Sequence, residues 1–157
     1  MSLLGLFEWC NNVAVAAAIR DSAWLFPAVE AVHLLALAVL GGTILVVDFR
    51  LCGLGLRRQS VAEIARDVQP WMAGSLATML VSGALLFSSE ALKCYENGAF
   101  WMKMISLLLA ILFTFTVRRK ATSAASQPTP TWGRVVAAIS LALWLGVAAG
   151  GRAIGFY

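Results

Sequence analysis

Four long apolar runs constrain the fold of this chain more than any other feature of its sequence. They cover about residues 25–47, 71–88, 100–117 and 135–150, and a helix needs ~20 residues, at a rise of ~1.5 Å each, to cross ~30 Å of hydrocarbon. Of the 157 residues, 61% are hydrophobic and 13% are charged, too few to give a soluble domain of this size a polar surface. The chain is therefore predicted to be an all-α integral membrane protein with a single transmembrane domain over residues 1–157.

Basic residues at the ends of these runs predict the orientation of the chain, because connections rich in Arg and Lys stay in the cytoplasm. The connection between the second and third runs has only Lys93 and Lys103, offset by Glu90 and Glu96, and the tail has only Arg152. The first and third connections are thus predicted to be cytoplasmic, with both termini on the outer side of the membrane. The net charge of +4 is then a topology signal and argues against nucleic acid as a partner. The cations concerned are Arg50, Arg57, Arg58 and Arg66 in the first connection, and Arg118, Arg119 and Lys120 in the third, with Arg134 just beyond it.

Short connections favour antiparallel neighbours, so we expect a four-helix bundle with up-down topology. The last three runs are short, which favours helices near the membrane normal, and the segment from Thr122 to Thr131 reads as a loop. Small residues at helical spacing indicate close helix packing, within one protomer or between the copies of a homodimer. The small pairs are Ala38 with Gly42 and Gly146 with Gly150, and the tryptophans expected to mark the starts of the four spans are Trp24, Trp71, Trp101 and Trp132.

The first twenty residues form a separate segment. No basic region precedes them, so we expect them to stay in the mature protein. Apolar side chains between Leu3 and Ala17 follow helical spacing, while Glu8 and Asn12 lie on the opposite face, which predicts an amphipathic helix in the outer membrane interface. A fifth span, which would move the N-terminus to the cytoplasm, is the alternative. The apolar face consists of Leu3, Leu6, Phe7, Cys10, Val13, Ala14 and Ala17.

Two ionisable residues, Glu30 and His33, lie within the first span. A charge-bearing side chain in hydrocarbon is costly, and therefore indicates a functional site. The two share one helical face, at depths of ~8 Å and ~12 Å by helical rise. In antiparallel neighbours, Met79 comes to a similar depth, and Lys103 and Arg152 come to the outer edge. We therefore expect these five residues to form one cluster in the outer half of the bundle.

Haem b is the first interpretation of this cluster, with electron transfer, and a quinone as the redox partner, as the function. His33 is then an axial ligand, and Lys103 and Arg152 lie near the propionates. Because the chain has one histidine, three arrangements of the iron are open. The iron is five-coordinate with His33 alone, or it is bound by His33 and a methionine such as Met79, or it is shared by two copies of His33 across a dimer.

Two other interpretations stay open. Glu30 and His33, with Met or Cys, have the ligand types that bind copper or another metal, for metal binding or transport. Alternatively the chain binds no cofactor and is a non-catalytic subunit of a larger membrane complex. Glu30 and His33 would then bond to each other, or to polar groups of a neighbouring helix, and fix the packing. Whether the chain is an enzyme stays open with them.

Four further residues carry smaller expectations. Asp48 and Arg50 follow the first span and are expected to form an interfacial ion pair or anchor, without a buried partner. No second inward charge is evident in the middle of the spans. Cys10 and Cys94 fall on the outer, oxidising side, so they either form a disulfide or stay apart, with Cys10 facing lipid.

The stretch from Pro27 to Gly42, with Glu30 and His33 three residues apart, and the segment Val47-Asp-Phe-Arg-Leu51 resemble a family of uncharacterised bacterial four-helix inner-membrane proteins. Pro70-Trp71 and Ala99-Phe-Trp-Met-Lys103 fit the same pattern, so the resemblance covers most of the chain. More distantly, a small bundle with a histidine in its first helix is similar to copper-resistance D proteins and to the haem-containing membrane protoporphyrinogen oxidase. This likeness implies redox or metal chemistry near His33, although the aromatic and Pro-Arg features of the oxidase are absent here.

Overall fold

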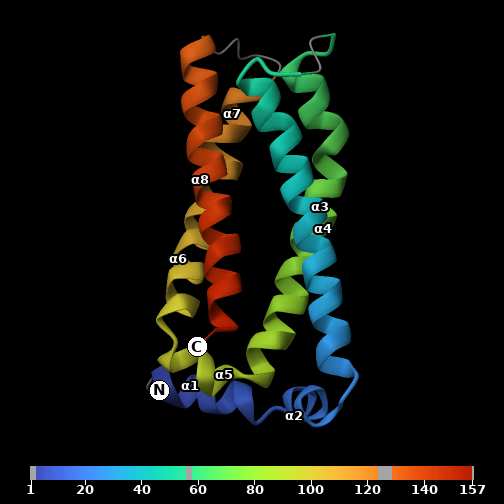
Figure 1. Ribbon diagram of the computed structural model, residues 1–157, viewed down its shortest axis with the longest axis vertical. Helices are drawn as coiled ribbons and strands as arrows, with labels where there is room; N and C mark the ends of the chain where they lie inside the picture. The colour runs from blue at the N-terminus through green and yellow to red at the C-terminus, as the bar shows by residue number, and fades with distance from the viewer. Residues whose placement is uncertain (1–2, 56–57, 124–128, 157) are drawn as a thin grey trace.

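The computed structural model describes residues 3–55, 58–123 and 129–156, and every regular element in them is a helix. Four long helices run side by side, each antiparallel to the one before it, so the all-α, up-down membrane bundle is confirmed (Figure 1). Both chain ends lie at one end of the bundle, the terminal end; the other we call the arginine end, after Arg50, Arg66, Arg118 and Arg119. The long helices are α3 (Leu25–Leu51), α4 (Val61–Ser89), α6 (Gly98–Phe113) and α8 (Pro130–Ile154). The third span is α6 together with the π-helical turn η1 (Thr114–Arg118) and the short helix α7 (Arg119–Ala121), which continue it.

The four spans are longer than the apolar runs suggest, with 27, 29, 24 and 25 residues. The largest difference is in α4, which begins at Val61, ten residues before Trp71. A capping box begins this helix early: Ser60 Oγ accepts from the Glu63 amide, and the Glu63 carboxylate accepts from the Ser60 amide. Pro70 then lies inside the helix. The expectation that Trp71 marks the start of a span is therefore wrong.

The predicted loop from Thr122 to Thr131 is also shorter at its far end. Thr129 caps α8 by accepting a hydrogen bond from the Trp132 amide, and Pro130 is the first residue of that helix, a position where a missing N–H does no harm. Residues 124–128 of this loop lie outside the described residues, as does Arg57.

The long helices pack as two hairpins joined along one side. Helix α3 packs against α4 and α8, and α8 also packs against α6, whereas α4 and α6 are not among the closely packed pairs of the described chain. Glycines allow the close contacts. A Cβ on Gly150 would lie 3.0 Å from Lys103 Cβ, and one on Gly133 would lie 2.7 Å from the Leu51 carbonyl oxygen. The predicted packing role of Gly146 also holds, because its Cβ would lie 3.2 Å from Ser106 Oγ.

The other predicted small pair behaves differently. Ala38 and Gly42 on α3 are both exposed, and no atom of the described chain lies within 4 Å of a Cβ built on Gly42. This pair therefore faces away from the bundle and makes no helix contact within the protomer.

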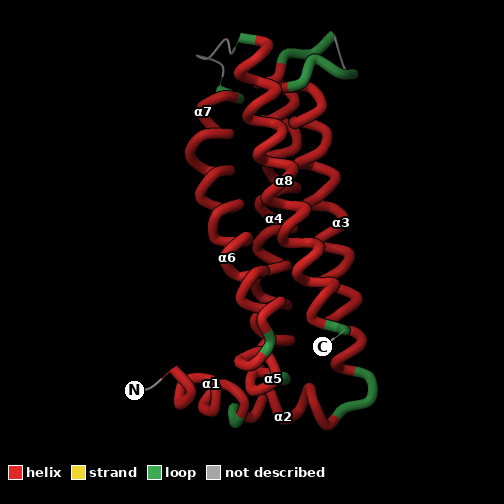
Figure 2. The backbone as a smooth tube through the Cα atoms, turned by 60° about the vertical axis from the view of Figure 1, so that its left-hand side comes forward, coloured by secondary structure: helices red, strands yellow, loops and turns green. Residues whose placement is uncertain are grey.

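Short helices cover the terminal end of the bundle: α1 (Leu3–Asn11), α2 (Ala14–Asp21) and α5 (Ala91–Glu96). Helices α1 and α2 lie across the long helices (Figures 1 and 2), and we call the two together the lid. At 9 and 8 residues each is too short to cross a membrane, so the alternative of a fifth span is wrong. The prediction of a single helix up to Ala17 is also wrong, because Val13 is extended and separates α1 from α2. The two helices pack against different parts of the bundle: α1 packs against α5 and α4, and α2 packs against α4 and α3.

Apolar side chains fill the bundle in three layers. The central layer draws on all four long helices, a second lies at the arginine end around Val47 and Val136, and the third joins the lid to the terminal end. In the third layer the Phe7 ring of α1 meets the Phe87 and Tyr95 rings edge-on, with centroids 5.1 and 5.2 Å away. Aromatic contacts thus attach α1 to the bundle, whereas α2 is attached through buried Ala16 and Ile19 and a hydrogen bond from Arg20 to the Ser89 carbonyl.

Replacing Gly133 with Ala is expected to destabilise the protein by about 1–3 kcal/mol, because the new methyl group would overlap the Leu51 carbonyl and separate α8 from α3. Gly74→Ala on α4 is the matched control, because Gly74 is exposed and no neighbouring element lies within 4 Å of a Cβ there, and it should be neutral or stabilising by up to about 1 kcal/mol, since alanine favours helix. The measurement is the midpoint of thermal unfolding in detergent. Equal stability of the two variants would contradict the packing described.

Candidate functional site

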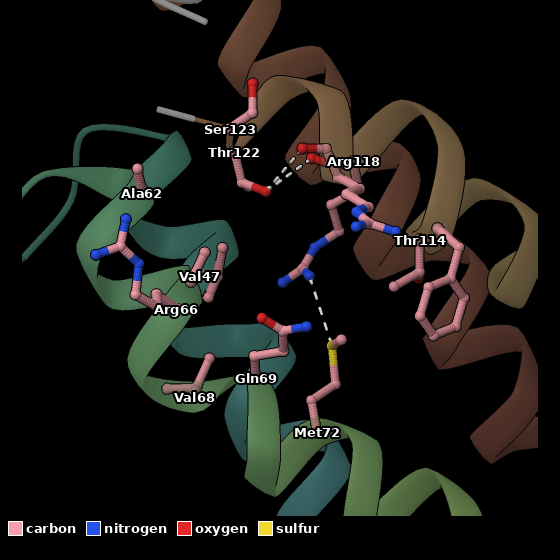
Figure 3. A pocket seen from close by; sticks show the side chains of 13 residues that line it. Val47, Ala62, Arg66, Val68, Gln69, Met72, Thr114, Arg118, Thr122 and Ser123 are labelled. Carbon is pink, nitrogen blue, oxygen red and sulfur yellow. Dashed lines mark hydrogen bonds between the residues drawn. The ribbon is translucent and has the colours of Figure 1, made fainter. Parts of the chain in front are cut away.

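A buried ion pair joins the first and third spans near the arginine end. Arg118 Nε donates to Asp48 Oδ1 at 2.8 Å, and the side chains of Arg118 and Asp48 are 5% and 0% exposed. The same guanidinium donates to the Ile44 carbonyl at 3.3 Å and approaches the Met72 sulfur at 3.9 Å, the contact dashed in Figure 3. The expectation that Asp48 pairs or anchors with Arg50 at the interface is therefore wrong, and Arg50 Nε instead donates to the Gln59 carbonyl.

Arg118 was not predicted to be buried, because it precedes two further cations and reads as part of a cytoplasmic connection. The turn η1 differs from the α-helix before it in having π-helical hydrogen bonding, which widens the turn and changes the direction of the side chains that follow. Thr114 at its start accepts a hydrogen bond from Trp144 Nε1 of α8 at 3.3 Å. The sequence feature that could have revealed the burial of Arg118 was Asp48, since a carboxylate at the end of a span requires a partner.

A second polar site, the terminal cavity, lies in the other half of the bundle. It has a volume of about 580 Å³ and is bounded by the four long helices and α5. The structure brings all five predicted cluster residues to this cavity. They are Glu30 and His33 from α3, Met79 from α4, Lys103 from α6 and Arg152 from α8.

His33 is held between two helices. Its Nδ1 lies 2.9 Å from Ser82 Oγ of α4, and the Ser82 hydroxyl donates to the Thr78 carbonyl at 2.6 Å. With the hydroxyl hydrogen directed at the Thr78 carbonyl, Ser82 Oγ is the acceptor in this contact, and the neutral ring then carries its proton on Nδ1 and has a lone pair on Nε2. A Cβ on Gly83 would lie 3.1 Å from His33 Cε1, so a side chain at this position would press against the ring.

Glu30 is exposed at the rim of the cavity. The alternative in which Glu30 and His33 bond to each other does not occur, since the ring bonds to the neighbouring helix instead.

The two cations of the terminal cavity have no carboxylate partner among the described residues. The side chain of Lys103 lies along α8, where a Cβ on Gly151 would be 3.5 Å from Nζ. The Arg152 guanidinium lies over the Phe156 ring, 4.9 Å from its centroid. Within the described chain the ion pairs are those of Arg118 with Asp48 and Lys93 with Glu90. The cavity is therefore lined by two cations without an ion-pair partner, the half-buried Lys103 and the exposed Arg152, and the carboxylates of Glu30 and Glu90 also line it.

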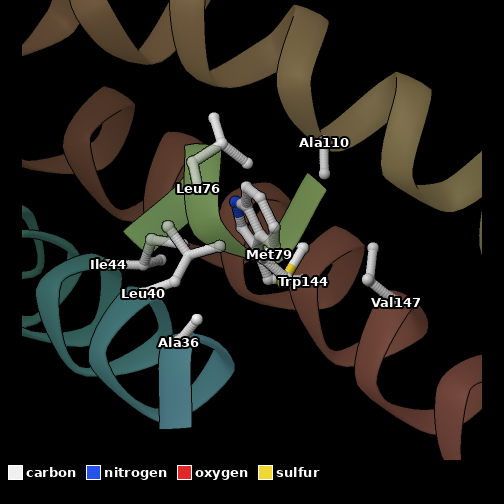
Figure 4. Packing of buried hydrophobic residues seen from close by; sticks show 8 residues of the cluster. All are labelled: Ala36, Leu40, Ile44, Leu76, Met79, Ala110, Trp144 and Val147. Carbon is white, nitrogen blue, oxygen red and sulfur yellow. The ribbon is translucent and has the colours of Figure 1, made fainter. Parts of the chain in front are cut away.

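Met79 lies below the terminal cavity in the central apolar layer. It is 3% exposed and points toward Trp144 and Val147 (Figure 4). Its main-chain carbonyl lies beside the His33 ring. Met79 therefore lies next to His33 on the same side of the cavity. From this position its side chain is poorly placed to bind the face of a flat cofactor opposite to His33.

The described residues contain no group of three or more His, Cys, Asp or Glu side chains that could hold a metal ion, and copper binding stays a prediction. Cys94 lines the cavity and is buried, which raises the pKa of its thiol, and the Glu90 carboxylate adds to this shift. Cys10 and Cys94 belong to the same apolar layer as free thiols.

Together these features define a four-helix membrane protein with a polar cavity at one end and a buried ion pair at the other. Residues 6–157 match a family of unknown function (DUF6644), and the chain belongs to this family. This agrees with the resemblance to uncharacterised four-helix membrane proteins. No curated protein and no solved structure matches the chain, and nothing supports the more distant likeness to copper-resistance D proteins or to protoporphyrinogen oxidase.

Removing one partner of the buried ion pair is expected to cost about 3–5 kcal/mol, because the other charge stays buried without compensation. Asp48→Asn and Arg118→Gln should each show this loss as a lower thermal midpoint in detergent, and the double variant should lose clearly less than the sum. Arg50→Gln is the control, since its side chain bonds outside the bundle. Additive losses in the double variant would indicate that Asp48 and Arg118 act independently.

Proposed function

We propose that this protein binds haem b in the terminal cavity, with His33 as an axial ligand, and takes part in electron transfer in the membrane. The observation that carries the proposal is the convergence of a histidine with a free Nε2 and two unpaired cations on one apolar cavity. When bound, haem supplies one-electron chemistry. The protein supplies the ligand, the charge and the exclusion of water.

The residues of the cavity fit the two halves of this ligand. Haem has a large apolar face and two carboxylates at one edge, and Lys103 and Arg152 provide the charges that carboxylates require. The volume of about 580 Å³ suits a ligand of that size. Most of the wall is apolar, with Leu34, Leu37, Leu86, Phe87 and Phe100 among the residues that line it.

Ser82 acts through His33. Histidine ligands generally donate their second ring N–H to a hydrogen-bond acceptor, which fixes the tautomer and the ring direction. The contact from Nδ1 to Ser82 Oγ has this form. Because the Met79 side chain belongs to the central apolar layer, His33 would be the residue that holds the group within one copy of the chain.

A non-catalytic role is the second candidate, and the same hydrogen bond favours it. A buried contact between His33 of α3 and Ser82 of α4 also stabilises the packing of the two helices when no cofactor is bound. In that case the protein is a membrane subunit whose polar residues fix its structure.

The visible spectrum separates these two candidates. Protein purified in mild detergent from haem-sufficient cells is expected to show a Soret band that shifts on reduction. His33→Gln should abolish or shift the band, and added imidazole should restore it, because a free ligand can replace the lost ring. Met79→Leu is the control and should keep the wild-type spectrum.

The absence of a Soret band, or a band unchanged in His33→Gln, would overturn the proposed ligand. A colourless protein in which His33→Gln and Ser82→Ala lose the same stability, about 1 kcal/mol, would instead support the structural role. Size-exclusion profiles of the variants show whether each is folded.

We further propose that the terminal end faces the periplasm of a bacterial inner membrane, because cations concentrate at the opposite end. The buried Cys94 is a poor reporter, so the test uses new cysteines in a chain without its own. Lys93→Cys, whose side chain is 82% exposed, should react with an impermeant maleimide in spheroplasts, whereas Arg58→Cys should react only after lysis. The reverse pattern would invert the topology.

A homodimer is supported by Ala38 and Gly42, the small pair of α3 that faces away from the bundle. Helices approach closely at such pairs in membranes. The face they present is otherwise apolar, with Leu34, Leu35, Leu45 and Val46 exposed along the same helix.

A further inference from the structure

The arginine end contains a second cavity, which we call the arginine groove. It has a volume of about 250 Å³ and lies between α4 and the third span, next to the buried ion pair (Figure 3). The proposed haem site does not involve it, because the two cavities have no lining residue in common. The groove is lined by Val47, Ala62, Ala65, Arg66, Val68, Gln69, Met72, Thr114, Phe115, Arg118, Arg119, Thr122 and Ser123.

The charge of the groove is positive. Arg66 and Arg119 line it from opposite helices, both are exposed, and neither has an ion-pair partner among the described residues. Arg118 forms the inner wall, where Asp48 already balances its charge. No Asp or Glu lines the groove. The two free guanidinium groups therefore favour an anion, and guanidinium matches the oxygens of a phosphate in particular.

The groove changes from polar to apolar along its depth. Gln69 supplies an amide group near the arginines, and its side chain points into the groove in Figure 3. The Thr122 and Ser123 hydroxyls line the groove but already donate to the Arg118 and Lys120 carbonyls. Met72 follows about one turn deeper than Gln69 on α4. This order matches a lipid, with a phosphate at the headgroup level and hydrocarbon below it, better than it matches a free ion.

The helices on the two sides of the groove are also not held together by close packing. Helices α4 and α6 are not among the closely packed pairs of the described chain, and the groove lies between α4 and the extension of α6. A molecule that diffuses in the bilayer can reach it without passing through water. Basic pockets between transmembrane helices are known binding sites for anionic lipid headgroups.

We propose that the arginine groove binds the phosphodiester headgroup of an anionic phospholipid, with Arg66 and Arg119 as the charged contacts and the side-chain amide of Gln69 beside them. Arg118 positions the inner wall and is itself fixed by Asp48. The bound lipid fills the space between α4 and the third span, and stabilises the open side of the bundle.

The test compares lipid binding by the full chain in a non-ionic detergent, measured by native mass spectrometry and by the thermal midpoint. Wild-type protein should retain one phosphatidylglycerol in preference to phosphatidylcholine, and gain stability from it. The double variant Arg66→Gln with Arg119→Gln should lose affinity by roughly tenfold or more. The control is the double variant Lys120→Gln with Arg134→Gln, which removes the same amount of charge at the same end of the bundle. Both residues are exposed and neither lines the groove, so this variant should bind the lipid as the wild-type protein does.

Three results would overturn the proposal. The first is equal affinity of the wild-type protein for the two lipids, and the second is an equal loss in both double variants, which would mean that the charge acts without a defined site. The third is complete displacement of the lipid by millimolar inorganic phosphate, which would make a free anion the ligand. Size-exclusion profiles and thermal midpoints in the absence of lipid confirm that the variants fold.

Discussion

The bundle depends on how charge is accommodated where no water is present. In hydrocarbon a charged group must find a partner or a polar cavity, and Asp48 with Arg118 is a solution of the first kind, in which Oδ1 of the carboxylate is paired and Oδ2 is buried without a hydrogen-bond partner among the described residues. The pair also joins parts of the fold that otherwise touch little. Helix α3 and the turn η1 are not among the closely packed pairs of the described chain, so this contact ties the α3 and α4 hairpin directly to the third span. Polar contacts of this kind fix which helices face each other, while apolar side chains fill the space between them.

The terminal end uses the second solution. Lys103 and Arg152 have no carboxylate partner in the described chain, and they line a cavity with His33. The lid covers this end through the contacts of Phe7 with Phe87 and Tyr95. The two ends of one small protein therefore differ in chemistry. Charge at the arginine end is neutralised within the bundle or lies at the headgroup level, whereas charge at the terminal end stays available inside the bundle.

Much of this could be predicted from the sequence, for a physical reason. The rise of a helix is constant, so counting residues from the ends of antiparallel spans gives depths accurate enough to bring His33, Met79 and Lys103 to one level. Rotation about the helix axis is harder to predict, since one π-helical turn redirects every side chain after it. Arg118 shows this: its place beside Arg119 and Lys120 indicates a connection, and η1 makes it part of the interior. The early start of α4 was also difficult to predict. Pro70 and Trp71 are residue types that often begin a transmembrane helix, whereas the capping box that begins α4 lies ten residues before Pro70.

The geometry at His33 also limits what a purely structural role can explain. A hydrogen bond from Nδ1 to Ser82 accounts for the direction of the ring and for the glycine at position 83. It does not account for Lys103 and Arg152, which make no bond to either residue and come from the other hairpin. A cation in an apolar cavity is stable only if an anion or water compensates it. A ligand that brings negative charge to Lys103 and an electron-pair acceptor to His33 meets both needs at once. The functional proposal therefore depends on the whole cavity, and on the histidine only as one part of it.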